Sequence, residues 1–149
     1  MKLLGSILII FASIISSYFY EKKLKEDVKN SEALYDLIRY IKNKIEYFSI
    51  SVDDILKSYP NDDEFIRDLI NQKEQFNFNF LEKNIANDIK VFFKKLGKGF
   101  KREQLSLCEY TLKVLEAERD KMKKEISKKA KAFHALSLFF GIGCVIFLI

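Results

Sequence analysis

The stretch KMKKEISKKAKAFHALSLFFGIGCVIFLI, residues 121–149, decides the fold of this chain. Its first part carries six lysines, and residues 132–149 are eighteen residues without Asp, Glu, Lys or Arg. At about 1.5 Å per residue, such a helix is roughly 27 Å long, close to the roughly 30 Å of hydrocarbon in a bilayer. We therefore expect residues 132–149 to form a transmembrane helix.

A second apolar run lies at the other end of the sequence. Residues 3–20 are again eighteen residues without charge, and Glu21 and three lysines follow almost at once. A cleaved signal peptide is the alternative, but the apolar run continues through Tyr20 and no small-x-small cleavage site precedes the charges. We predict a retained span here.

Basic residues gather beside both predicted spans and set the expected topology. The membrane-flanking set is Lys22, Lys23, Lys25, Lys128, Lys129 and Lys131. By the positive-inside rule the loop between the spans is cytoplasmic. The sequence thus predicts a multi-pass protein of the cell membrane, with a transmembrane helix over 1–20, a cytoplasmic helical domain over 21–131 and a C-terminal transmembrane helix over 132–149.

The composition argues against several classes of function. The net charge is +5, and because the basic residues lie next to the predicted membrane exits, they favour contact with membrane lipid over nucleic acid. Cys108 and Cys144 fall on different sides of the predicted topology, so no disulfide is expected. The single histidine, His134, begins the apolar run, where an interfacial role is expected. We predict no enzyme, no metal site and no cofactor.

The residues between the spans show helical spacing throughout. Apolar residues recur every three or four positions over 24–48, which predicts an amphipathic helix that continues from the first span with at most a short break. Ser49, Ser51 and Asp53 supply cap-type residues for a short helix over 52–59, which ends before Pro60. A third helix follows the acidic and capping residues of 61–64. Phenylalanines alternate over 75–80, which we interpret as a corner that fills core, and a fourth helix covers 81–96. The fold class is therefore all-α, a helical bundle.

The last predicted helix begins at Lys101 and, if unbroken, runs to the end of the chain. Apolar side chains occupy heptad positions Leu105, Cys108, Leu112, Leu115, Met122, Ile126 and Phe133. A self-associating coiled coil and packing against the first helix explain this pattern equally well. We favour packing within the chain, because the two spans must approach each other. The acidic residues, Glu118 included, are interpreted as caps and solvated faces.

Gly97 and Gly99 interrupt the helical pattern before the last helix. Two nearby glycines predict a helix stop with positive φ angles. A phosphate-binding loop is the alternative, but no strand precedes these glycines and the spacing of the phosphate-loop motif is absent.

Particular residues resemble a known family over essentially the whole chain. Four parts of the chain carry the similarity: the start Met1-Lys2-Leu3-Leu4-Gly5, the segment Lys44-Ile45-Glu46-Tyr47 followed by Val52-x-Asp54-x-Leu56, the residues Phe92, Leu96, Gly97 and Gln104, and the tail residues Leu136, Gly141 and Gly143. In these parts the chain resembles the family of stage III sporulation protein AB of endospore-forming bacteria. This sequence departs at Phe93, Gly99 and Phe100, where the family pattern has Gly, Ser and Asp, and at Ile50-Ser51, where Thr-Pro is usual.

The resemblance implies a cytoplasmic helical domain like that of the type II secretion F-protein, a membrane platform. It implies a place in the mother-cell membrane, in the channel between mother cell and forespore. The expected partners are a secretion-type ATPase, stage III sporulation protein AA, and other proteins of the same channel. The resemblance also points to a contact surface at Leu96, Gly97, Lys98, Lys101 and Gln104.

Two further hypotheses stay open at this stage. One is a membrane-anchored coiled-coil adaptor or regulator that acts by self-association of the last helix, as a homo-oligomer. The other is an exported protein with a cleaved signal and a C-terminal anchor.

Overall fold

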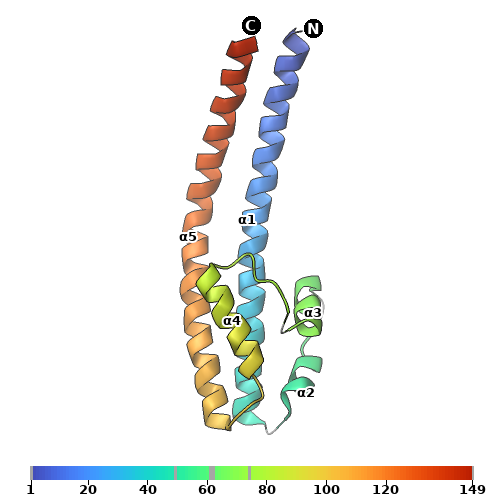
Figure 1. Ribbon diagram of the computed structural model, residues 1–149, viewed down its shortest axis with the longest axis vertical. Helices are drawn as coiled ribbons and strands as arrows, with labels where there is room; N and C mark the ends of the chain where they lie inside the picture. The colour runs from blue at the N-terminus through green and yellow to red at the C-terminus, as the bar shows by residue number, and fades with distance from the viewer. Residues whose placement is uncertain (1, 49, 61–62, 74, 149) are drawn as a thin grey trace. The chain divides into compact units, whose positions relative to one another are not determined.

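The computed structural model describes residues 2–48, 50–60, 63–73 and 75–148, and the side chains of 2–10, 141, 144, 145, 147 and 148 are outside the description. Five α-helices make up this part of the chain (Figure 1): α1 Lys2–Tyr47, α2 Val52–Lys57, α3 Glu64–Asn71, α4 Lys83–Lys95 and α5 Lys101–Leu148. Within these ranges no residue is in a β-strand. The prediction of an all-α fold is confirmed.

The two long helices are continuous. Residues 3–20 and the amphipathic stretch after them belong to one helix, α1, and the short break allowed for in the prediction does not occur. The last helix, α5, begins at Lys101 as predicted and is unbroken to Leu148, a continuity that the sequence left open. Ile149 lies outside the described residues.

The chain divides into two compact units, which we treat separately. The bundle unit is Asp27–Asp120, and the helix-pair unit combines Met1–Glu26 with Lys121–Ile149. This grouping does not test the membrane boundaries predicted at residues 20 and 132, which stay a prediction.

In the bundle unit, α1 and α5 run antiparallel. Lys42 pairs with Glu109 at 3.0 Å, and the guanidinium of Arg119 lies 4.8 Å from the ring centroid of Tyr35. Because residue numbers rise along one helix as they fall along the other, the helices must point in opposite directions. Figure 1 shows α2, α3 and α4 beside these two helices.

The core of the bundle unit is aliphatic and aromatic. From α1 it takes residues spaced by three or four positions, as the predicted amphipathic helix requires. Its fully buried side chains are Leu34, Leu37, Ile38, Ile41, Ile55, Ile66, Leu69, Phe78, Ile89, Phe92, Cys108 and Leu115.

The predicted heptad register of α5 is only partly right. Cys108 and Leu115 are buried, whereas Leu105 and Leu112 are half-buried. The other buried positions of α5 within the bundle unit are polar: Gln104, Thr111 and Glu118. These residues follow the same three-four spacing as Cys108 and Leu115, so α5 packs within the chain along a face one position away from Leu105 and Leu112.

Glu118 corrects the interpretation of the acidic residues as caps and solvated faces. It is buried, and its Oε1 accepts a 3.4 Å hydrogen bond from the backbone N–H of Glu82 at the start of α4. That helix has no side-chain cap of its own. A carboxylate near the positive end of a helix stabilises it, which explains an acidic residue at this buried position.

The short helices begin at the capping residues that the sequence predicts. Ser51 caps α2 by accepting from the N–H of Asp54, and Asp63 caps α3 by accepting from the N–H of Phe65. The corner before α4 has Phe78 fully buried and stacked on Phe93, with ring centroids 6.1 Å apart. Ser49, Asn61 and Asp62, also named as capping candidates, lie outside the described residues.

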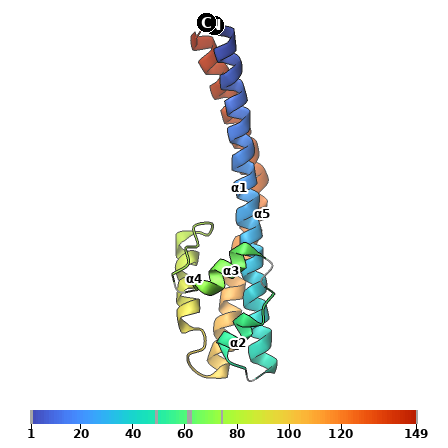
Figure 2. The same ribbon diagram turned by 90° about the vertical axis from the view of Figure 1, so that its right-hand side faces the viewer.

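In the helix-pair unit, α1 and α5 lie side by side (Figure 2). The rings of Tyr20 and Phe133 stack at 4.3 Å, and the His134 imidazole lies between two α1 side chains. Its Nε2 is 3.1 Å from Glu21 Oε2, and its Nδ1 is within hydrogen-bond reach of the buried Ser17 hydroxyl. His134 therefore joins the two helices through hydrogen bonds, a role beyond the interfacial one predicted for it.

No helix in the described part of the chain proves long and apolar enough to cross a membrane. The two transmembrane helices predicted over 1–20 and 132–149 are thus not supported. The prediction of these helices depended on apolar side chains, many of which the structure does not describe. These are the side chains of residues 2–10 and several between 141 and 149.

Candidate docking pocket between the α4–α5 turn and α2

The turn from α4 to α5 depends on two glycines with positive φ. Gly97 has φ 80° and Gly99 has φ 103°, a region that side chains with a Cβ rarely adopt, as predicted. Gly97 also lies close to α2, because a Cβ there would come within 3.3 Å of Val52 Cγ2. Any other residue at position 97 would therefore be strained by its backbone angle and would also require Val52 to shift by a few tenths of an ångström.

Gln104 holds this turn in place from the first turns of α5. Its Oε1 accepts a 2.9 Å hydrogen bond from the N–H of Gly97, and its Nε2 donates to the carbonyl oxygens of Lys95 and Lys98. The residue is 6% exposed. One buried amide thus bonds three backbone groups at the end of α4, of which the Lys95 carbonyl also accepts from the N–H of Lys98 at 3.0 Å.

The departures from the family pattern fit the geometry of this turn. Glu103 Oε2 accepts from the N–H of Phe100 at 3.2 Å and so caps the start of α5. A Cβ at Gly99 would lie 2.5 Å from that same oxygen, which a flexible glutamate side chain can relieve by moving. The φ of 103° is what makes this turn favour glycine where the family pattern has serine. Phe93 fills core, and Phe100 is 79% exposed.

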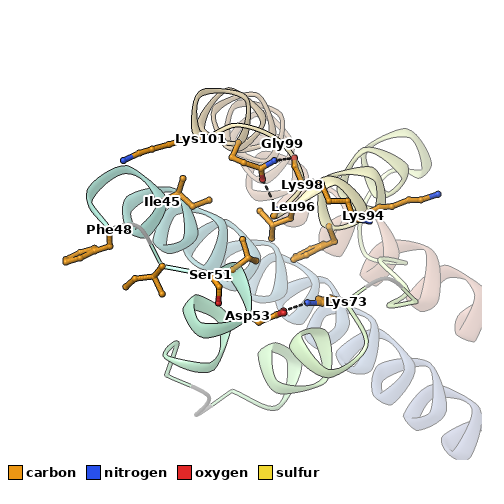
Figure 3. Close-up of a pocket in the computed structure, with 15 residues that line it drawn as sticks. Ile45, Phe48, Ser51, Asp53, Lys73, Lys94, Leu96, Lys98, Gly99 and Lys101 are labelled. Carbon is orange, nitrogen blue, oxygen red and sulfur yellow. Dashed lines mark hydrogen bonds and ion pairs between the residues drawn. The ribbon is translucent and has the colours of Figure 1, made fainter.

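An open pocket of about 590 Å³ lies between this turn, α2 and the end of α1 (Figure 3). Its apolar wall includes Ile45, Val52, Phe93 and Leu96. Phe48 and Ile50 extend this wall to the surface, where about half of each side chain is exposed.

Lysines dominate the charge of the pocket lining. The lining contains four of them, Lys73, Lys94, Lys98 and Lys101, and one acid, Asp53. Lys73 Nζ is 2.7 Å from Asp53 Oδ1, and this ion pair holds the pKa of the aspartate below its usual value. Lys101 Nζ donates to the backbone carbonyl of Glu46 at 2.7 Å, a neutral acceptor.

Lys94 and Lys98 are exposed, and within the described ranges neither takes part in an ion pair. The pocket is therefore an apolar surface with an excess of positive charge around it. Such a surface attracts an acidic partner electrostatically and offers apolar area for tighter contact.

The five residues predicted as a contact surface all line this pocket. Gly97, Lys98 and Lys101 are exposed, whereas Leu96 is buried in the wall and Gln104 is buried behind the turn. The amide of Gln104 makes its hydrogen bonds to backbone groups of the turn. Gln104 therefore holds the turn in position and does not itself face a partner. Whether a partner binds there stays a prediction.

Sequence reasoning missed the other side of the pocket. Ile45, Val52, Asp53 and Lys73 come from α1, α2 and the end of α3, far from Gly97 in sequence. Only the packing of α2 against the turn brings them together. The cap at Ser51 was a local signal for where α2 starts, but no local signal places α2 beside Gly97.

The basic residues predicted to flank a membrane all fall in the helix-pair unit. Lys25 pairs with Glu21 at 2.7 Å and Lys129 with Glu125 at 2.6 Å, each one helical turn apart. The other four are Lys22, Lys23, Lys128 and Lys131, and all are exposed.

Among the residues that the structure describes, no three His, Cys, Asp or Glu side chains are grouped as a metal site would require. Cys108 is buried in the bundle core, and burial raises the pKa of its thiol to about 11. At neutral pH this thiol is protonated and unreactive.

The fold and the pocket define an all-helical bundle protein with a basic, partly apolar surface pocket. A comparison with family models then identifies its family. The model described as stage III sporulation protein AB matches residues 2–72 and 64–149, and the chain belongs to this family. No curated protein and no solved structure gives a significant match. The family description indicates a role in sporulation, and this family is not a known enzyme family.

Proposed function

We propose that this protein is a non-enzymatic scaffold of the channel between mother cell and forespore. In this proposal the bundle unit couples a secretion-type ATPase, stage III sporulation protein AA, to channel proteins in the membrane. Family membership supports the assignment to sporulation. The observation that carries the docking role is the pocket, because residues from three separate parts of the chain form one exposed apolar and basic surface there.

The proposal also places the helix-pair unit in the mother-cell membrane. Large apolar side chains on both of its helices are more than half exposed, among them Phe11, Phe19, Leu136, Phe139 and Phe140. An apolar surface of this kind needs lipid or another protein to cover it. The lysines of the same unit suit contact with anionic headgroups. The proposal includes the arrangement that the family resemblance implies, a helical domain like that of the type II secretion F-protein held at a membrane.

The first experiment determines on which side of the membrane the pocket lies. A Cys144→Ala, Lys98→Cys variant is treated in intact sporulating cells with a membrane-impermeant maleimide, then again after lysis. Cys144→Ala alone is the matched control, because Cys108 is buried with a pKa of about 11 and should react slowly in both. We expect Lys98→Cys to be labelled only after lysis.

Labelling at that position before lysis would place the pocket outside the cytoplasm, away from any ATPase. That outcome would overturn the scaffold proposal and favour the exported protein. If the pocket is cytoplasmic, co-purification then tests the partner. The ATPase should be recovered with the wild-type chain and lost with Lys98→Glu, while the exposed Lys113→Glu on α5 should retain it.

A further inference from the structure

We propose that the pocket takes an acidic peptide segment of a partner protein, anchored by one apolar or aromatic side chain. This inference rests on the proposed docking role and names the chemistry of the occupant. It follows from two features of the lining, which together exclude a purely ionic or a purely apolar ligand.

The first feature is charge. Four lysines and one aspartate line the pocket, and the aspartate is already paired with Lys73. Figure 3 shows Lys94 and Lys101 extending in opposite directions on the two sides of the pocket. Because these ammonium groups lie apart, one small anion cannot meet both. A chain segment with several carboxylates can, which favours a peptide.

The second feature is the apolar wall. Ile45 and Leu96 are buried beneath the pocket, while Phe48 and Ile50 remain about half exposed at its edge. Covering these side chains would remove apolar area from water and add affinity that charge alone does not provide. A peptide carries carboxylates and an apolar side chain within one short flexible segment, which suits lysines and an apolar wall this close together. Polyphosphate and anionic lipid vesicles are the competing ligands in the test below.

The turn is also held ready for binding. Gln104 fixes the backbone of Gly97 and Lys98 through its buried amide, and Lys101 is fixed on the carbonyl of Glu46. A surface that does not need to be ordered on binding loses less entropy when the partner arrives. The geometry therefore points to docking of a flexible segment on a rigid site.

The experiment selects ligands for the full-length protein in detergent from a phage library of random peptides. We expect the enriched peptides to share clustered Asp or Glu next to Phe, Leu or Trp. Two synthetic versions of the strongest binder would then be measured by fluorescence anisotropy, one with its acids changed to amides and one with its apolar anchor changed to Ala. Both changes should weaken binding.

Protein variants locate the site. Lys94→Glu with Lys98→Glu should weaken the peptide about tenfold or more, since two attractions become repulsions, and salt at about 0.5 M should weaken wild-type binding. The matched control is Lys83→Glu with Lys113→Glu, two exposed lysines outside the pocket lining. For the apolar wall, Phe48→Ser with Ile50→Ser should weaken binding and the exposed Val91→Ser should not.

Enrichment of peptides without acids would overturn the proposal, as would binding that the Lys94 and Lys98 reversals leave unchanged. Equal binding of polyphosphate or of anionic lipid vesicles, abolished by the same reversals, would reassign the pocket to phosphate. These outcomes are independent of the labelling experiment. If the pocket proves to be outside the cytoplasm, the scaffold proposal fails while the peptide specificity can still hold.

Discussion

The bundle unit and the helix-pair unit use the same two helices in opposite ways. In the bundle unit, α1 contributes Leu34, Ile38 and Ile41 to a core that is closed to solvent. In the helix-pair unit, α1 exposes Phe11 and Phe19 by about 60%. The side chains between α1 and α5 there include the hydrogen-bonded Ser17 and His134.

This difference is the one expected if, as proposed, the two units face different surroundings. Water drives apolar side chains into a core, so the bundle unit has the arrangement of a protein folded in water. Helices in an apolar environment gain little from burying apolar groups and associate instead through small residues and hydrogen bonds. The helix-pair unit follows the second pattern, which supports the membrane part of the proposed function.

The largest effect should separate the two units by a matched pair of substitutions. Phe92→Ala removes a fully buried ring from the bundle core and should lower the free energy of unfolding by about 3–5 kcal/mol. Phe19→Ala, at a ring 63% exposed in the helix-pair unit, should change it by less than about 0.5 kcal/mol. Chemical denaturation of the detergent-solubilised chain, followed by circular dichroism, measures both. Similar losses for the two variants would mean that the units do not differ in packing.

A smaller effect is expected from the polar contact that the bundle unit does bury. Gln104→Ala removes the side-chain partner of the Gly97 N–H and of the Lys98 carbonyl, which should cost about 1–3 kcal/mol, whereas the Lys95 carbonyl keeps its bond from the N–H of Lys98. Hydrogen exchange should also quicken at Gly97 and Lys98. Ser106→Ala, exposed on the same helix, is the control and should alter neither quantity. An unchanged exchange rate in Gln104→Ala would contradict its role as the residue that holds the turn.

The sequence predicts the helices well because their signals are local. Neighbouring residues alone predict the caps at Ser51 and Asp63 and the positive φ angles at Gly97 and Gly99. They also predict helices before and after those glycines. The family resemblance also pointed to five residues that line the pocket: Leu96, Gly97, Lys98, Lys101 and Gln104.

The polar core positions could not be predicted in this way. A heptad pattern is recognised by its apolar members, so Leu105 was preferred to Gln104, although both suit a helix face. What decides between them is the turn beside α5, whose backbone groups need an amide. Glu118 is similar, because its burial depends on the start of α4, which is distant in sequence. Such positions depend on three-dimensional neighbours.

In the helix-pair unit, removal of one polar contact should have a modest effect. His134→Ala removes the hydrogen bonds to Glu21 and Ser17, and we expect a loss of at most about 1 kcal/mol. Thermal unfolding in detergent checks this, with the exposed Leu136→Ala as the control on the same helix. If His134→Ala instead matched the loss in Phe92→Ala, polar pairing would dominate the stability of the whole chain.

The smallest effect concerns an exposed ion pair of the bundle unit, between Asp63 at the start of α3 and Lys29 on α1, 2.9 Å apart. The hydrogen bond from the Lys29 ammonium and that from the Phe65 N–H lower the pKa of Asp63 below its ordinary 3.8. Because the pKa of Asp63 is lower in the folded state than in the unfolded state, the ionised carboxylate stabilises the fold at any pH above the unfolded-state pKa. This stabilisation is lost as the pH falls through the folded-state pKa.

Asp63→Asn should therefore differ from the wild type by a constant amount above about pH 5, and the difference should shrink below about pH 4. Thermal midpoints measured across this range test the prediction, with Asp68→Asn, exposed on the same helix, as the control. Because the pair is open to solvent, salt should reduce the effect further. If Asp63→Asn matched the wild type at every pH, Asp63 would act as a helix cap alone, a role that asparagine fills equally well. A difference that persists unchanged at low pH would contradict the assignment to the ion pair with Lys29.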